Sequence, residues 1–158
     1  MTEKTFKTVY AAYGSNMDEA QMAFRCPDAK LIGTGEIKNY RLMFKGELPY
    51  SYATIEEEEN SSVPVVLWEL SAADEFSLDR YEDCPKKYYK KVIAVETAEG
   101  TISNVMVYVM HEEYPLNPPD THYYAAIFDA YEKFGLDSAK LEEALKFSDR
   151  YRRTFNFS

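Results

Sequence analysis

The stretch YYKKVIAVETAEGTISNVMVYVM, residues 88–110, decides the fold class of this chain. Apolar residues alternate with polar ones on both sides of Glu99-Gly100, and a period of two residues is typical of half-buried strands. The pair Glu99-Gly100 supplies the turn between the two runs. The stretch therefore predicts an antiparallel hairpin of residues 88–97 and 101–110.

Further strand candidates precede this hairpin in close succession: residues 4–13, 31–37, 40–46, 52–56 and 63–70. The first is apolar on both faces near its end, which is typical of a central strand. Between the last two lies EEEENSS, residues 56–62, where a charge run precedes turn formers. This composition predicts a solvated hairpin loop.

Helices are predicted at only four points. Residues 17–25 form a short helix with Ser15 or Asn16 as its cap and with Met17, Ala20 and Phe24 on one face. Ser71 and Asp74 begin a second helix, which Pro85 ends, and two more follow Asp120 and residues 137–138. Their inward faces carry Tyr124, Ile127, Phe128, Tyr131 and Phe134, then Leu141, Ala144, Leu145 and Tyr151. Many strands with few helices predict an α+β fold with a mainly antiparallel, closed sheet.

The composition excludes several classes of protein. The 158 residues suit one domain, and a formal charge of −9 argues against unaided binding to nucleic acid or an anionic membrane. The chain shows no secretory leader and no apolar run of membrane length, so we expect a cytoplasmic protein. Two distant cysteines and two histidines have no metal-ligand spacing, so we expect no metal and no cofactor.

The segment Gly14-Ser15-Asn16 is the first candidate site. A strand that passes through a tight glycine turn into a helix leaves backbone N–H groups unpaired at the helix start. Such donors can hold a carboxylate or a developing oxyanion. Taken alone, these three residues are equally typical of a plain capped turn.

Glu82, in LDRYEDCP (residues 78–85), is the second candidate. It shares one helix side with Leu78 and Tyr81 and lies near the helix C-terminus, where the dipole disfavours an anion. Both effects, together with the like charge of Asp79, predict a raised pKa suited to a general base. The competing interpretation is a solvated carboxylate at a helix end.

Three other side chains invite a chemical interpretation. Cys84 could act as a nucleophile only with an activating base, and neither histidine has a neighbourhood that points to that role, so a buried thiol is favoured. Tyr123 and Tyr124 are typical of core or rim aromatics, although a tyrosine hydroxyl could also orient a substrate carboxylate.

Taken in order, these pieces resemble the gamma-glutamylcyclotransferase (AIG2-like) family. VYAAYGSNM, residues 9–17, is similar to the opening strand of that family and its Tyr-Gly-Ser-Asn substrate loop. The segment of residues 78–97 resembles its LDxxE motif followed by an aromatic-rich strand. The resemblance also runs through GTGEIKNYRLMF (33–44), YATIEEEENSSVPVVLWEL (52–70) and THYYAAIFDAYEKFGL (121–136), and so covers nearly the whole chain.

The resemblance implies one domain over residues 1–158, a small mixed β-barrel with peripheral helices and a cavity at one end. It implies Glu82 as the acid/base catalyst and a substrate-binding loop of Tyr13, Gly14, Ser15, Asn16 and Met17, to which we add Tyr123. The implied reaction converts a γ-glutamyl amine, amino acid or small peptide to 5-oxoproline and a free amine. The implied partner is this small substrate, and the sequence leaves open whether two copies of the chain form a homodimer.

The sequence also departs from the family pattern at two points. Asp83 follows Glu82 where relatives often have glycine, and Lys140 and Leu141 occupy the region in which some relatives place a late tyrosine. These departures leave open an alternative from another class, a non-catalytic ligand-binding or interaction module with the same fold.

Overall fold

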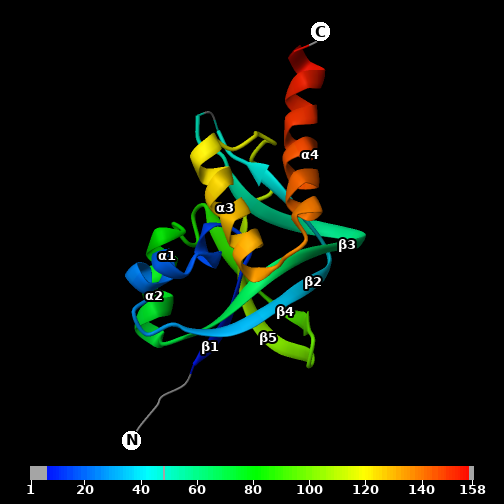
Figure 1. Cartoon of the computed structure of the whole chain (residues 1–158). Coiled ribbons are helices and arrows are strands. Elements are labelled where there is room, and N and C mark those ends of the chain that lie inside the picture. The colour runs from blue at the N-terminus through cyan, green and yellow to red at the C-terminus, as the bar shows by residue number, and fades with distance from the viewer. Residues whose placement is uncertain (1–6, 48, 157–158) are drawn as a thin grey trace, which may run out of the picture.

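The computed structural model describes residues 7–47 and 49–156, with side chains up to Asp149. In this part of the chain five strands close into a barrel in the order β1-β3-β2-β4-β5 (Figure 1). Their bounds are β1 Thr8–Ala12, β2 Lys30–Lys45, β3 Tyr52–Leu70, β4 Tyr88–Thr97 and β5 Gly100–Met110. The predicted α+β class with a closed, mainly antiparallel sheet is confirmed.

The first strand closes the barrel. β1 pairs antiparallel with β3, from Thr8 opposite Leu70 to Ala12 opposite Val66. Its other edge pairs parallel with β5 at Tyr10 and Met106, while the remaining neighbours run antiparallel. β1 thus lies between two strands, as its apolar character on both faces predicts.

The second and third strands are longer than predicted. The predicted strands of residues 31–37 and 40–46 are parts of one strand, β2, which ends at Lys45, one residue earlier than predicted, and is bent by a bulge between Lys38 and Tyr40. Asn39 lies in this bulge with φ 64°, a conformation that asparagine tolerates better than most residues, and its side-chain oxygen accepts a hydrogen bond from the N–H of Asn60 (3.0 Å). The bulge changes the strand direction without ending the ladder.

The hairpin loop predicted for residues 56–62 is wrong. These residues lie inside β3, where Glu56, Glu57 and Ser62 pair with residues of β2. The charged side chains are largely solvated, as predicted, but Glu56, Glu57 and Ser62 continue the ladder with β2, and residues 58–61 bulge out opposite Asn39. A run of glutamates is compatible with a strand when one of its faces meets solvent.

The chain leaves β1 through a different helix start from the one predicted. Ser15–Met17 form one turn of 3-10 helix (η1), and α1 begins only at Glu19 and ends at Arg25. Asp18, rather than Ser15 or Asn16, caps α1 by accepting a hydrogen bond from the N–H of Gln21 (2.9 Å). The predicted inward face of Met17, Ala20 and Phe24 is wrong: Met17 is buried but lies in η1, and Ala20 and Phe24 are exposed, Phe24 by 88%. Met22 is the buried residue of α1.

The other helices begin and end near the predicted signals. Ser71 and Asp74 form a capping box at the start of α2 (Ala72–Tyr81). Asp120 caps α3 (Thr121–Phe134), which ends at Gly135 with φ 68°. Ile127 and Tyr131 are buried as expected, whereas Phe128 is exposed. Among the described residues, no helix has both the length and the apolar character needed to cross a membrane.

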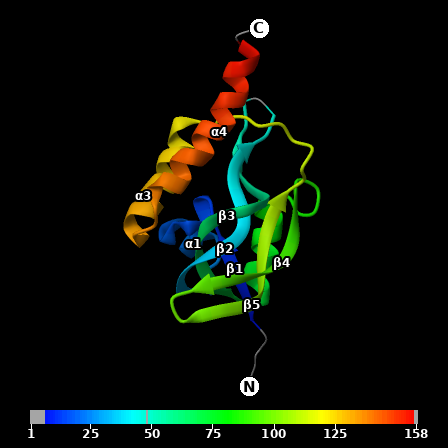
Figure 2. The same ribbon diagram turned by 90° about the vertical axis from the view of Figure 1, so that its right-hand side faces the viewer.

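The last helix, α4 (Ser138–Asn156), follows α3 along one side of the barrel, and the β4–β5 hairpin lies on another side (Figure 2). Asp137 accepts a hydrogen bond from the N–H of Ala139 (3.1 Å), and Leu141 and Ala144 are buried as predicted. The side chain of Tyr151 lies outside the described residues. The core joins residues of all five strands with residues of α3 and α4.

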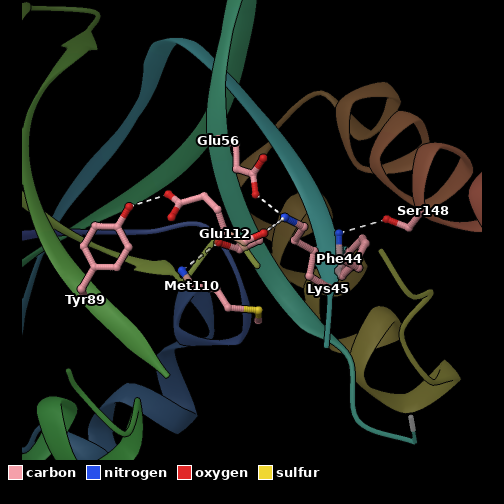
Figure 3. A network of polar contacts seen from close by, with 8 residues as sticks. Phe44, Lys45, Glu56, Tyr89, Met110, Glu112 and Ser148 are labelled. Atoms are coloured by element: carbon pink, nitrogen blue, oxygen red, sulfur yellow. Dashed lines mark hydrogen bonds and ion pairs between the residues drawn. The ribbon is translucent and has the colours of Figure 1, made fainter. Parts of the chain in front are cut away.

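A polar network fixes α4 and the segment after β5 to the barrel (Figure 3). The Lys45 side chain is 9% exposed; its ammonium forms an ion pair with Glu56 and donates a hydrogen bond to the backbone carbonyl of Glu112 (2.9 Å). The hydroxyl of Ser148 on α4 accepts a hydrogen bond from the N–H of Phe44 (3.0 Å). Three segments distant in sequence therefore meet at the end of β2.

Candidate active site

A cavity of about 300 Å³ lies where β1 ends, and the turn after β1 and the end of α2 both contribute to its wall. Phenol rings dominate this wall, and carboxylates, one lysine and backbone groups complete it. The lining residues are Tyr10, Tyr13, Gly14, Ser15, Asn16, Tyr52, Ala53, Tyr81, Glu82, Asp83, Lys87, Tyr88, Tyr108 and Tyr123.

The backbone of Gly14 packs closely against residues of β3 and α3. A Cβ atom at this position would lie 3.3 Å from both the Ala53 Cβ and the Tyr123 hydroxyl, which is tighter than ordinary packing. That hydroxyl accepts a hydrogen bond from the N–H of Ala53 (3.0 Å), and the Tyr13 hydroxyl donates to the carbonyl of Tyr108 (2.7 Å). The Tyr13 hydrogen bond fixes the start of the turn, and the bonded pair of Ala53 and Tyr123 forms the surface against which Gly14 packs.

The turn leaves two backbone donors at the cavity. Within the described residues, the N–H groups of Ser15 and Asn16 make no hydrogen bond to protein. The N–H of Met17 is already bonded to the carbonyl of Gly14 (3.0 Å), and its side chain is fully buried outside the cavity wall. The backbone N–H groups that could bind an anion are therefore those of Ser15 and Asn16, not that of Met17.

Asn16 connects this turn to Glu82. Its side chain is 3% exposed, and its Nδ2 donates to the Tyr10 hydroxyl (3.1 Å) and to Glu82 Oε2 (3.4 Å). Arg25 donates to Asn16 Oδ1 (2.6 Å) and lies over the Tyr81 ring with 3.6 Å to its centroid. Because a guanidinium can only donate, Arg25 fixes the orientation of the amide, and the amide must then direct its N–H₂ at the carboxylate.

Glu82 follows the last residue of α2, and its N–H donates to the carbonyl of Leu78 (2.8 Å). The side chain is half-buried, because one part of it meets the cavity and the rest is covered by protein. Burial raises the pKa of Glu82 from its usual 4.5 to about 7, against a lowering by the charges of Arg25 and Lys87. This carboxyl can accept and return a proton near neutral pH.

Asp79 does not act on Glu82 in the way the sequence interpretation assumed. Its carboxylate accepts a hydrogen bond from the Tyr108 hydroxyl (2.5 Å) and forms an ion pair with Lys90 (3.0 Å). It is not among the groups that raise the pKa of Glu82. Because Asp79 is engaged elsewhere, the Glu82 shift comes from burial rather than from a like charge.

The phenols of the wall stay neutral. Burial raises the pKa of Tyr10, Tyr13 and Tyr88 well above 10, and the pKa of Tyr123 is raised for the same reason. The Tyr88 hydroxyl donates to the carbonyl of Ala53 (2.8 Å). These four phenols therefore make the wall polar without adding negative charge to it.

A family model described as "Gamma-glutamyl cyclotransferase, AIG2-like" matches residues 10–135, which is well over half of the chain. The chain belongs to this family.

Its similarity to relatives in the gamma-glutamyl cyclotransferase family is distant but extends along the chain. The Gamma-glutamylcyclotransferase of Bos taurus is 27% identical over 136 residues, covering 81% of this chain and 72% of that protein. The protein of the same name from Mus musculus is 27% identical over 146 residues, covering 87% of this chain and 77% of its own length. These names support gamma-glutamylcyclotransferase activity in general.

Solved structures show the same fold. A structure named Gamma-glutamyl cyclotransferase superposes with a TM-score of 0.79 at 24% identity, covering 88% of this chain and 86% of its own. A Homo sapiens protein described as uncharacterized superposes with a TM-score of 0.78 at 25% identity, covering 87% and 86%. The closed barrel with peripheral helices is thus the fold of the family.

The structure brings most of the residues predicted from the family resemblance to one cavity. Tyr13, Gly14, Ser15, Asn16, Tyr123 and Glu82 all line it, and Met17 does not. Cys84 is half-buried outside the cavity wall, and burial raises its pKa, which disfavours the thiolate that a nucleophile needs. In the described part of the chain, no group of three His, Cys, Asp or Glu side chains is arranged to hold a metal ion.

Sequence reasoning missed Arg25, Lys87 and the aromatic wall formed by Tyr10, Tyr52, Tyr88 and Tyr108. The run KKYYKK, residues 86–91, carries a signal for two of them, because it is basic and aromatic in a chain with a formal charge of −9. Arg25 gives no such signal, since its role depends on where α1 lies relative to α2.

Proposed function

We propose that this protein is a cyclotransferase that converts a γ-glutamyl amine, amino acid or small peptide to 5-oxoproline and the free amine, with Glu82 as general acid and base. The observation that carries the proposal is the pairing of two groups in one cavity. A carboxyl with a pKa near 7 lies beside a turn with two available backbone donors, and Asn16 joins them.

The proposed reaction needs no outside nucleophile. The α-amine nitrogen of the glutamyl group attacks its own γ-carbonyl carbon, and the new C–N bond closes a five-membered ring. The amide bond to the leaving nitrogen then breaks. Starting from the neutral α-amine, one proton moves from the attacking nitrogen to Glu82 and from Glu82 to the leaving nitrogen. The extra proton that an ammonium must first give up ends on the released amine, so atoms and charge balance without water.

The cavity favours this reaction in two ways. A bound chain held with its amine against its carbonyl gains about 7–11 kcal/mol from well-oriented intramolecular attack. An α-amine with a pKa of about 8 is largely protonated at neutral pH and needs a base. A carboxyl titrating near 7 can take that proton and return it, which contributes about 10²–10⁴-fold.

The turn after β1 is proposed to bind the glutamyl part of the substrate. The N–H groups of Ser15 and Asn16 can donate to its α-carboxylate or to the oxyanion that develops at the γ-carbonyl. Tyr13 and Tyr123 form the adjoining wall, and Met17 contributes by anchoring the turn through its buried side chain. The absence of a side chain at Gly14 lets the turn pack closely against Ala53 and Tyr123, which form part of the same wall.

The test is Glu82→Gln, assayed by release of 5-oxoproline and free amine from a panel of γ-glutamyl compounds. Glutamine keeps the shape and can still accept the Asn16 hydrogen bond, but it cannot carry the proton. We expect kcat to fall by about 10²–10⁴-fold. Glu99→Gln, at an exposed glutamate in the β4–β5 turn, is the matched control and should retain full activity.

Two outcomes would contradict the proposal. Near wild-type release by the Glu82→Gln variant would remove Glu82 from the chemistry. No turnover of any γ-glutamyl compound by the wild-type protein would favour the alternative, a ligand-binding module with the same fold.

A further inference from the structure

Lys87 is a charged group on the cavity wall that the proposed chemistry does not use. It lies in the turn between α2 and β4, five positions after Glu82, and its N–H donates to the carbonyl of Asp83 (2.8 Å). Its side chain is half-buried and lines the cavity together with Tyr52. A short backbone turn thus fixes its position relative to the proposed base.

The Lys87 ammonium is held over aromatic rings rather than by an acid. Its Nζ lies 4.7 Å from the centroid of the Tyr52 ring and 6.0 Å from that of Tyr114. A ring face attracts a cation but does not neutralise it. The rings therefore leave the hydrogen-bond donors of Lys87 available for another partner.

Within the described residues, no carboxylate forms an ion pair with Lys87. This is notable in a chain with 27 acidic and 18 basic residues. Six other lysines of the described part do pair with a carboxylate: Lys7, Lys38, Lys45, Lys90, Lys91 and Lys133. Lys30, Lys86, Lys140 and Lys146 also lack such a pair in this part of the chain, but Lys87 is the unpaired lysine that lines the cavity.

The other charged groups of the wall are Glu82 and Asp83. Asp83 is exposed and is joined to Lys87 through its backbone only. Glu82 is near enough for the charge of Lys87 to lower its pKa. A small molecule that contacts Glu82 in a cavity of about 300 Å³ therefore also comes within reach of Lys87.

We infer that Lys87 binds a carboxylate carried by the leaving amine, so that the substrates are γ-glutamyl amino acids or peptides rather than γ-glutamyl alkylamines. The inference rests on the proposed function, in which the turn of Ser15 and Asn16 takes the glutamyl part. Such a substrate carries a second carboxylate beyond the amide nitrogen. The unpaired ammonium beside the base is the group that can receive it, and the size of the cavity suits a dipeptide.

The test compares γ-glutamylalanine with γ-glutamylethylamide, which differ only by the carboxylate on the leaving amine. The readout is the ratio of their kcat/KM values, because any effect of Lys87 on the Glu82 base acts on both substrates and cancels. We expect Lys87→Met to lower this ratio by about tenfold or more, the effect typical of one lost charge-assisted hydrogen bond. Lys87→Arg should keep the preference for γ-glutamylalanine, and Lys86→Met, at the exposed neighbour, should leave the ratio unchanged.

A ratio that stays constant in Lys87→Met would overturn the inference, whether both rates fall together or neither changes. An equal fall in kcat/KM for both substrates would mean that Lys87 binds the glutamyl part of the substrate or acts on the Glu82 base. If the wild-type protein turns over neither these two compounds nor any other γ-glutamyl compound of the panel, the proposed function fails, and calorimetric binding of the same two compounds decides about Lys87. The inference is supported if γ-glutamylalanine binds more tightly than γ-glutamylethylamide and this difference is lost in Lys87→Met. It is refuted if the two compounds bind equally well, or if the substitution leaves their binding unchanged.

Discussion

Replacing Glu82 with glutamine should make the folded protein more stable at alkaline pH while removing its activity. Burial raises the pKa of Glu82 from 4.5 to about 7, so the native state holds a proton that the unfolded chain releases between these two pH values. The resulting contribution to the free energy of unfolding is fully present below pH 4.5 and is lost as the pH rises through about 7. Glutamine is neutral at every pH and keeps that contribution.

The magnitude follows from the size of the pKa change. Each pKa unit corresponds to about 1.4 kcal/mol, so the full change of Glu82 amounts to about 3 kcal/mol above pH 7. Glu82 is only half-buried and faces a cavity that admits solvent, which reduces the cost of its charge. We therefore expect the glutamine variant to exceed the wild-type protein by about 2 kcal/mol at pH 8.5.

The assay is urea denaturation of both proteins at pH 5 and at pH 8.5, with Glu99→Gln as the control for loss of an exposed charge. The stability difference between the glutamine variant and the wild-type protein should be small at pH 5 and should grow toward pH 8.5. Equal stabilities at both pH values would show that the Glu82 carboxylate is well solvated in the native state. Burial would then not be what prepares the Glu82 carboxyl as a base.

Two further changes test neighbouring features. Arg25→Met removes a charge that lowers the pKa of Glu82, so the acidic limb of the kcat/KM profile should move to higher pH; an unmoved limb in the pH–rate profile would contradict this. Lys45→Met leaves Glu56 without its ion-pair partner and should lower the free energy of unfolding by about 2 kcal/mol. This is less than the cost of breaking a fully buried ion pair, because the Glu56 side chain is 27% exposed. Urea denaturation of Lys45→Met with and without Glu56→Leu checks this, because the double variant should regain most of the loss, and an equal loss in both would place its cause elsewhere.

Elements specified by neighbouring residues could be predicted from the sequence. The β4–β5 hairpin has its period and its turn within one stretch, and the capping box of Ser71 and Asp74 needs only four residues. Gly135 ends α3 because only a residue that tolerates positive φ fits there without strain. In each case the determining contacts lie within one or two turns of chain.

Elements that depend on a distant partner could not be predicted in this way. The bulge at Asn39 resembles a break between two strands until β3 is placed beside it, and the glutamates of residues 56–59 resemble a loop for the same reason. The site shows the same limit. The family resemblance predicted the turn after β1 and Glu82, but Arg25 and Lys87 reach the site through the packing of α1 and through the turn after α2.

The parallel pairing of Tyr10 with Met106 has a consequence for when this protein can begin to work. Tyr10 and Tyr108 both border the cavity, so its wall is incomplete until the last strand has joined the first. Contacts between residues so far apart in the chain form late, because closing a long loop costs entropy before any contact repays it. A nascent chain that already carries Glu82 and the turn after Tyr13 therefore has no finished pocket, and activity reports on completion of the entire barrel.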